Sequence, residues 1–125
     1  MRTFMALIAT ILSVSFSYAI QSESILKTNS IKAGVSAQQF DKAFGYYKKY
    51  SNSLKNKKYI SFIDFSISSA KERLFVVNLY TGRVSKFLVT HGMGSGNEYA
   101  VKFSNKSESH QSSLGLYIIG SEYVG

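Results

Sequence analysis

The chain of 125 residues contains no cysteine, no proline and only two histidines. Without cysteine, these residues can form no disulfide, no thiolate nucleophile and no thiolate metal site. His91 and His110 lie far apart in the sequence, and neither belongs to an H-x-x-x-H or H-x-H pair, so no metal site is predicted. No low-complexity or repeated segment is present either. The composition predicts one small domain at most, and either its core suffices without disulfides or the chain is part of something larger.

The chain also lacks an apolar run of the roughly 20 residues needed to span a bilayer. An apolar stretch from Phe4 to Leu12 follows the basic Arg2, is interrupted by Thr10, and leads to the small-residue site Ser17-Tyr18-Ala19. This pattern is typical of a cleaved secretory signal peptide. We therefore predict a signal peptide at residues 1–19, export to the periplasm or cell envelope, and no stable membrane anchor after cleavage.

Acidic residues are scarce, since 7 Asp and Glu stand against 15 Lys and Arg and give a net charge of +8. Such a charge attracts anionic cell-wall polymers and lipid head groups. A basic cluster interleaved with tyrosines could also stack single-stranded nucleic acid. We favour a solvated helix end with the tyrosines in the core, because export removes most nucleic acid from reach, and we predict no nucleic-acid partner. The cluster consists of Lys48, Lys49, Lys55, Lys57 and Lys58, and its tyrosines are Tyr46, Tyr47, Tyr50 and Tyr59.

The first part of the exported chain divides into two regions. Residues 20–35 are polar, contain no aromatic side chain and follow no clear period, which predicts a flexible leader. Ser36 and Gln39 then have the spacing of a capping box. Apolar side chains recur at three- and four-residue spacing behind it, which predicts an amphipathic helix followed by a basic loop over residues 36–58. The apolar stripe comprises Phe40, Ala43, Phe44, Tyr47 and Leu54.

From Tyr59 the apolar pattern changes to the two-residue period of a β-strand. Tyr80–Arg83 predicts a hairpin turn in which Gly82 adopts positive φ. The fold class we predict is therefore mainly β with one N-terminal helix. Runs rich in β-branched and aromatic residues predict further strands at Arg73–Leu79, Val84–Thr90 and Leu114–Ile119.

A glycine-rich stretch follows the third predicted strand. Gly92 and Gly94 begin a dinucleotide-binding fingerprint, but Asn97 replaces its third glycine and no helix pattern follows, so we predict no bound nucleotide. Ser95 lies in no G-x-S-x-G elbow, and serine is common in turns, so we predict no serine nucleophile. The pattern favours a loop that uses glycine for positive φ.

Six segments of the second half follow one another in a characteristic order: Ile60–Ser66, Arg73–Leu79, Thr81–Gly82, Val89–Gly96, Ala100–Asn105 and Ser112–Tyr117. Together they resemble the exported murein L,D-transpeptidase catalytic domain family of the YkuD type, over residues 59–125. The resemblance implies a mostly β fold and peptidoglycan stem peptides as substrate. In that family a cysteine thiolate attacks an L,D-peptide bond, forms a thioester acyl-enzyme and passes the acyl group to an amine or to water. We predict no cofactor.

The resemblance also implies that the catalytic histidine and cysteine follow the Ser-Leu-Gly-x-Tyr strand, in an H-G and an S-x-G-C element. Neither element follows Ser113–Tyr117, so the domain at residues 59–125 is predicted to be incomplete and inactive as it stands. His91 precedes that strand and matches an earlier loop, so no catalytic residue is assigned. The resemblance implies that His91, Ser95 and Ser113 border the substrate site of a complete domain.

Three interpretations of the chain stay open. It is a truncated member of the enzyme family, a non-catalytic exported module that binds peptidoglycan, or a small exported protein that docks through a strand edge. An incomplete β domain also predicts unpaired strand edges and an uncovered apolar surface around Tyr117–Ile119.

Overall fold

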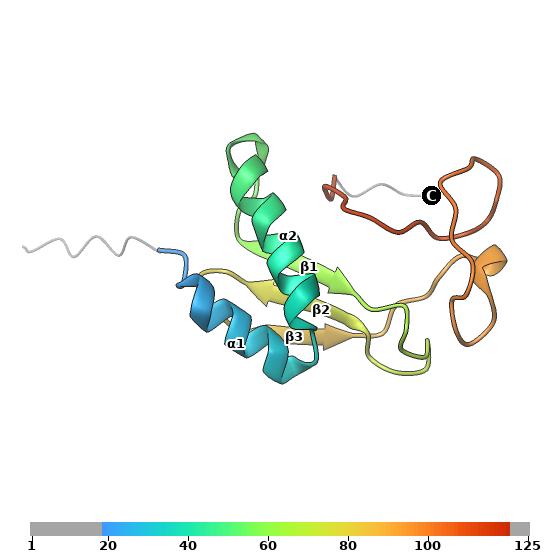
Figure 1. Cartoon of the computed structure of the whole chain (residues 1–125), viewed down its shortest axis with the longest axis horizontal. Coiled ribbons are helices and arrows are strands. Elements are labelled where there is room, and N and C mark those ends of the chain that lie inside the picture. Colours follow the sequence, from blue (N-terminus) through green and yellow to red (C-terminus); the bar gives the residue numbers. More distant parts are fainter. Residues whose placement is uncertain (1–18, 121–125) are drawn as a thin grey trace, which may run out of the picture.

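The computed structural model describes residues 19–120, which fold into two layers (Figure 1). Two helices lie against one face of a three-stranded antiparallel sheet, and a long segment with little regular structure follows the sheet. The predicted signal peptide lies outside the described residues apart from Ala19. The elements are α1 Glu23–Ala33, α2 Ala37–Tyr50, η1 Ser51–Ser53, β1 Tyr59–Ile63, β2 Leu74–Asn78, β3 Val84–Phe87 and η2 Met93–Ser95.

Residues 20–35 contain the helix α1, so the predicted flexible leader is wrong. The helix begins after Ser22, whose Oγ accepts a backbone hydrogen bond from the first turn at 3.4 Å. It ends at Gly34, which has a φ of 120° and whose amide donates to the carbonyls of Ser30 and Ile31. Glycine suits this C-terminal cap because it reaches positive φ without a steric cost from Cβ.

Tertiary contacts attach α1 to the turn between β2 and β3. Asn29 Nδ2 donates to the Gly82 carbonyl at 2.8 Å, and the Gln21 amide donates to the Leu79 carbonyl at 2.8 Å. Leu26 is fully buried beneath the helix. Both burial of Leu26 and polar contacts with distant backbone attach the helix. Polar contacts of this kind produce no regular spacing of apolar residues in the sequence. The hydrophobic pattern alone therefore does not predict this helix.

The second helix, α2, begins with the predicted capping box. Ser36 Oγ accepts a hydrogen bond from the Gln39 amide at 3.1 Å, and Gln39 Oε1 accepts one from the Ser36 amide at 3.4 Å. Phe40 and Phe44 are buried one turn apart, with stacked rings whose centroids are 5.3 Å apart. The helix ends at Tyr50, and η1 and a loop complete the region.

The sheet has the order β1-β2-β3, and both pairings are antiparallel. Phe62 of β1 lies opposite Phe75 of β2, and Val77 of β2 lies opposite Val84 of β3. The turn between β2 and β3 is tight, and Gly82 within it has a φ of 73°. The predicted hairpin and its glycine are therefore confirmed.

The core lies between the two helices and the inner face of the sheet. The ring of Phe62 packs against that of Phe40 with a centroid distance of 6.2 Å, which joins α2 to β1. Full burial stabilises the fold by about 1.5–3 kcal/mol for each large apolar side chain. The buried cluster comprises Leu26, Val35, Phe40, Phe44, Phe62, Phe75, Val77 and Leu79.

The predicted fourth strand at Leu114–Ile119 is not formed. Gly115 has a φ of 134°, and within residues 19–120 this segment pairs with no strand of the sheet. A strand requires a partner for its backbone N–H and C=O groups, which an apolar pattern does not supply by itself. Ile118 and Ile119 are instead 70% and 82% exposed. The architecture has a small three-stranded sheet that is consistent with the predicted β domain, but it has two helices rather than one.

The outer face and the edges of the sheet remain uncovered by the described residues. Ile63 and Phe87 are 41% and 49% exposed, and both lie opposite Leu74 in the register of the sheet. Within residues 19–120, β1 and β3 each pair on one side only. This matches the expectation of unpaired edges. The part of the chain that the structure describes contains no helix of the length and apolar character needed to cross a membrane.

Candidate functional site

The glycine loop, residues His91–Gly96, follows β3 and contains η2. It runs beside a segment that comes much later in the chain, on the side of the molecule away from α1 (Figure 1). The Gly94 amide donates to the His110 carbonyl at 2.7 Å, and the Gly92 amide donates to Ser112 Oγ at 2.9 Å. Main-chain groups therefore fix the loop against residues that are distant in sequence.

Glycine is required in this loop for two different reasons. A Cβ at Gly92 would lie 2.4 Å from the His110 carbonyl oxygen, and one at Gly94 would lie 2.6 Å from that of Ser109. These two glycines permit a close backbone approach, and neither has positive φ. The expectation that the loop uses glycine for positive φ is correct only at Gly96, whose φ is 145°.

Both ring nitrogens of His91 are held by neighbouring groups. Arg73 Nη2 lies 2.8 Å from Nδ1, and the Gly96 carbonyl oxygen lies 3.1 Å from Nε2. Because a guanidinium has only donors, Nδ1 accepts from Arg73 and the ring proton sits on Nε2, which donates to the carbonyl. The Phe65 ring packs edge-on to the imidazole at 6.5 Å. In this arrangement His91 has no free ring nitrogen to act as a general base.

Arg73 is the buried anchor of the loop. Its side chain has no exposed surface. Nε and Nη2 donate to the Val89 carbonyl at 3.0 and 2.8 Å, and Nη1 donates to the Ile67 carbonyl at 3.1 Å. The guanidinium carbon lies 5.2 Å from the Phe65 ring centroid. Carbonyl dipoles and the aromatic face thus take the place of the water that a buried cation loses.

The three predicted substrate-site residues have different surroundings. Ser95 lies in the same loop as His91, is fully buried, and accepts a hydrogen bond at Oγ from the Ser112 amide at 2.8 Å. Ser113 is half-buried on the neighbouring segment, and its hydroxyl accepts a hydrogen bond from the Tyr117 hydroxyl. Contact of these residues with a substrate stays a prediction, and Ser95 has no exposed surface through which to make it.

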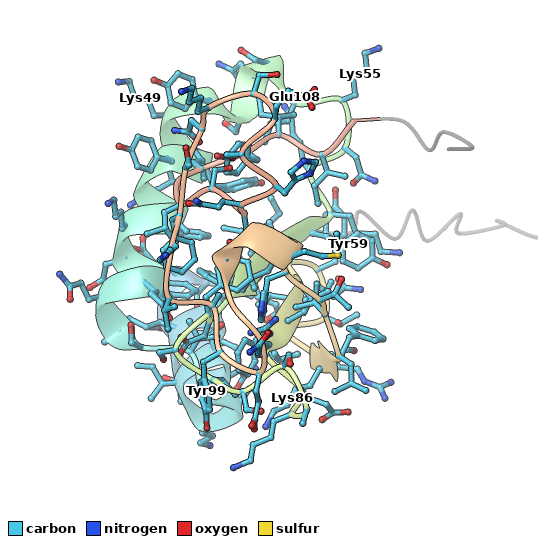
Figure 2. All side chains as sticks on the ribbon, turned by 90° about the vertical axis from the view of Figure 1, so that its right-hand side faces the viewer. Lys49, Lys55, Tyr59, Lys86, Tyr99 and Glu108 are labelled. Atoms are coloured by element: carbon cyan, nitrogen blue, oxygen red, sulfur yellow. The ribbon has the colours of Figure 1, made fainter. Side chains whose placement is uncertain are left out.

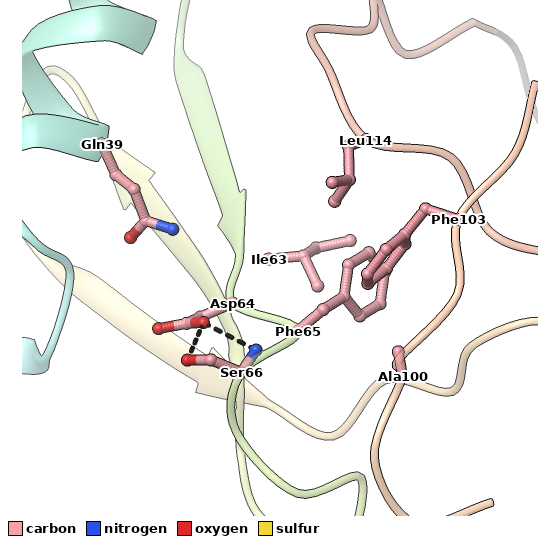
Figure 3. Close-up of a pocket in the computed structure, with 8 residues that line it drawn as sticks. All are labelled: Gln39, Ile63, Asp64, Phe65, Ser66, Ala100, Phe103 and Leu114. Atoms are coloured by element: carbon pink, nitrogen blue, oxygen red, sulfur yellow. Dashed lines mark hydrogen bonds between the residues drawn. The ribbon is translucent and has the colours of Figure 1, made fainter. Parts of the chain in front are cut away.

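A shallow groove adjoins the glycine loop (Figure 3). The rings of Phe65 and Phe103, with centroids 5.7 Å apart, form its apolar wall. Asp64 forms a polar wall, and its Oδ1 accepts hydrogen bonds from the Ser66 amide at 2.9 Å and the Ser66 hydroxyl at 2.6 Å. Because Phe65 also packs against His91, the groove and the loop share a side chain. The other lining residues are Gln39, Ile63, Ala100 and Leu114.

In this arrangement the loop residues His91 and Ser95 are not placed as a base and a nucleophile, and the groove beside them can shape a binding surface. Covalent catalysis needs a nucleophile within hydrogen-bond reach of a base. His91 is engaged at both nitrogens, Ser95 is buried, and the sequence contains no cysteine. Across residues 19–120, no three His, Asp or Glu side chains are placed to hold a metal ion. The geometry defines a fixed loop scaffold beside a groove.

The comparisons with known proteins identify the class to which this scaffold belongs. Residues 31–125 match the family described as L,D-transpeptidase catalytic domain. Because the match covers well over half of the chain, the chain belongs to that family, and the resemblance in the sequence is confirmed. No curated protein and no solved structure gives a match. The match begins within α1 and includes α2, whereas the six sequence segments place the similarity only from residue 59.

Two residues that build the loop are missed by reasoning from the sequence. In the sequence, Arg73 is recognised only as the first residue of a predicted strand. Ser112 is recognised only as the first residue of the segment Ser112–Tyr117 that resembles the family. A charged residue directly before the apolar residues of a predicted strand is the one signal available for Arg73, because a charge that becomes buried needs partners. For Ser112 the sequence offers no signal of its contact with Gly92 and Ser95.

Proposed function

We propose that this protein is an exported, peptidoglycan-directed member of the L,D-transpeptidase family, and that residues 1–125 supply its loop scaffold and groove but not its nucleophile. The observation that carries the proposal is the family match over residues 31–125. The family's acyl transfer proceeds through a thiolate, and these residues contain no cysteine. Any thiol that serves this scaffold therefore comes from outside the 125 residues, and by themselves they are inactive.

Stem peptides of peptidoglycan suit the charge and the groove. Their carboxylates are attracted by the exported chain, which after loss of Arg2 has 14 Lys and Arg against 7 Asp and Glu, a net charge of +7. The shallow groove offers the apolar rings of Phe65 and Phe103 beside the polar Asp64. On this proposal the glycine loop fixes His91, and His91 in turn supports the Phe65 wall of the groove. Non-catalytic binding of peptidoglycan is the activity left to these residues when the thiol is absent.

Mixing the purified chain with intact peptidoglycan and a disaccharide-tetrapeptide is expected to give retention without chemistry. The protein should sediment with peptidoglycan at low salt and be released as salt rises, because screening weakens attraction between exposed charges. Its intact mass should show no added acyl group. A complete L,D-transpeptidase serves as the control that does form the adduct. An acyl adduct on this chain would contradict the absence of a nucleophile, and failure to sediment at low salt would contradict the peptidoglycan partner.

Export rests on residues 1–19, which lie outside the described structure apart from Ala19. Expression in a bacterial host is expected to yield a periplasmic chain that begins at Ile20. The substitution Ala19→Arg should leave an uncleaved precursor, because signal peptidase requires a small residue at that position. N-terminal sequencing of the periplasmic and cytoplasmic fractions measures both outcomes. A chain that keeps Met1 and stays in the cytoplasm would argue against export.

A further inference from the structure

A second groove, here called the tyrosine groove, lies between α2, β1 and the last described residues. It has a volume of about 750 Å³. Its lining comes from residues 43–56, 59–61 and 116–120, and no residue of the glycine loop takes part. In Figure 1 the final red segment runs back toward α2 and β1, and its residues 116–120 complete the lining of the tyrosine groove. The tyrosine groove shares no lining residue with the groove beside the glycine loop, although its Tyr117 contacts Ser113.

Four partly exposed tyrosines line the tyrosine groove: Tyr46 at 36%, Tyr50 at 42%, Tyr59 at 47% and Tyr117 at 61% exposure. The rings of Tyr46 and Tyr50 are nearly parallel, with an interplanar angle of 12° and centroids 6.3 Å apart. Exposed aromatic side chains gathered in one place mark a binding surface. Flat aromatic faces stack on the C–H faces of sugar rings, and tyrosine hydroxyls bond to sugar hydroxyl and amide groups.

Tyr47 lies deeper in the same groove and is uncharged. Burial, with a smaller contribution from the neighbouring Tyr80, raises the pKa of Tyr47 above its ordinary value of 10.0. The phenol therefore stays protonated at neutral pH and donates to the Lys57 carbonyl at 3.5 Å. Fixed charge in the groove accordingly comes from its rim.

The rim of the tyrosine groove is basic. Lys55 lines it, Lys49 Nζ lies 5.1 Å from the Tyr50 ring centroid, and Lys58 Nζ lies 5.2 Å from that of Tyr59. No Asp or Glu is among the lining residues, and within residues 19–120 these three lysines form no salt bridge. Figure 2 shows Lys49 and Lys55 at the same end of the molecule. Unpaired cations beside aromatic walls select an anionic ligand that also has surfaces for stacking.

We propose that the tyrosine groove binds a peptidoglycan glycan strand, with amino-sugar rings stacked on the tyrosines and stem-peptide carboxylates on the lysines. This inference rests on the proposed function and adds to it a binding site separate from the glycine loop. A groove fits a chain-like ligand, whereas a flat bilayer surface cannot enter it. Sugar rings use the aromatic walls and the stem carboxylates use the basic rim, so one ligand accounts for both features.

Titration calorimetry with a soluble disaccharide-tetrapeptide tests the assignment on the full chain. We expect Tyr50→Ala and Tyr59→Ala each to raise Kd about tenfold, since loss of one stacking contact costs up to about 1.5 kcal/mol. Lys55→Gln should raise Kd about threefold at low salt, as for one exposed ion pair, and have little effect at high salt. Far-UV circular dichroism establishes that each variant is folded.

Matched controls exist outside the groove. Tyr99 is 49% exposed and Lys86 is exposed, and both lie at the opposite end of the molecule from Lys49 and Lys55 (Figure 2). Neither side chain lines the tyrosine groove. Tyr99→Ala and Lys86→Gln are therefore expected to leave Kd unchanged. These control variants remove the same kinds of side chain as the test variants. Lys86→Gln also changes the net charge by the same amount as Lys55→Gln.

Three outcomes would overturn the assignment. The first is equal binding by the Tyr59→Ala and Tyr99→Ala variants, which would place the ligand elsewhere while the proposed function stands. The second is an absence of saturable binding by the wild-type chain, and sedimentation with intact peptidoglycan then decides the proposed function separately. The third is tighter binding to anionic lipid vesicles or to a single-stranded oligonucleotide than to the disaccharide-tetrapeptide.

Discussion

Replacing Gly96 by alanine is expected to lower the free energy of unfolding by about 3 kcal/mol, which is a large part of the stability of a small domain. Gly96 has a φ of 145° and a ψ of −174°, a backbone region that is essentially restricted to glycine. A Cβ there would lie 2.2 Å from the Tyr99 carbonyl oxygen, a main-chain atom that cannot rotate away. Urea unfolding followed by circular dichroism measures the change.

The matched control for this variant is Gly45→Ala in α2. A Cβ at Gly45 would meet no other part of the chain within 4 Å, and the residue lies inside a helix, so alanine should stabilise the protein by about 1 kcal/mol. The same chemical change thus has opposite expected signs at the two glycines. A Gly96→Ala variant as stable as Gly45→Ala would show that the loop does not require its glycine conformation.

Replacing Arg73 by methionine is expected to lower the free energy of unfolding by about 3 kcal/mol. The substitution leaves the carbonyls of Val89 and Ile67 without their donors, and each buried unsatisfied acceptor costs about 1–3 kcal/mol. Removal of a buried charge offsets part of that cost. Arg73→Lys should lose nearly as much, because one ammonium cannot reproduce the planar fork that reaches Val89, Ile67 and His91.

The surface residue Arg83 provides the control for the arginine variants. Arg83 is exposed, and Arg83→Met should change the stability by less than about 0.5 kcal/mol. Nitrogen NMR of the His91 ring adds a readout that global stability does not give. In the wild type Nδ1 should be the unprotonated nitrogen and Nε2 the protonated one, and Arg73→Met should abolish this preference. Equal stability of Arg73→Met and Arg83→Met would contradict the anchoring role.

The elements that the sequence predicts well are those with local signals. The capping pair Ser36 and Gln39 fixes the start of α2, and Gly82 fixes the hairpin between β2 and β3. The helix α1 has local caps at Ser22 and Gly34 but no apolar period, and its attachment depends on buried Leu26 and on a contact between Asn29 and Gly82. The opposite error occurs at Leu114–Ile119, where an apolar pattern typical of a strand finds no pairing partner among the described residues.

The candidate site likewise has features that the sequence predicts and features that it does not. His91 and Ser95 fall in one loop because they are close in sequence, so their proximity could be predicted. That both nitrogens of His91 are engaged, and that Ser95 is buried against Ser112, could not be predicted. Gly96 engages Nε2 from within the loop, but the contacts at Nδ1 and at Ser95 depend on Arg73 and Ser112, which lie far from the loop along the chain.

The sequence by itself determined which chemistry these residues can perform and which family they resemble. The absence of cysteine excludes a thiolate from the 125 residues whatever their fold, because reactivity of that kind is a property of residue type. Only the tertiary structure decided which side chains are available. It engages His91, buries Ser95 and gathers Tyr46, Tyr50, Tyr59 and Tyr117 in one groove. Whether a side chain is available to a ligand depends on its burial and on its hydrogen bonds with residues distant in sequence. Both are fixed only when the chain folds into its tertiary structure.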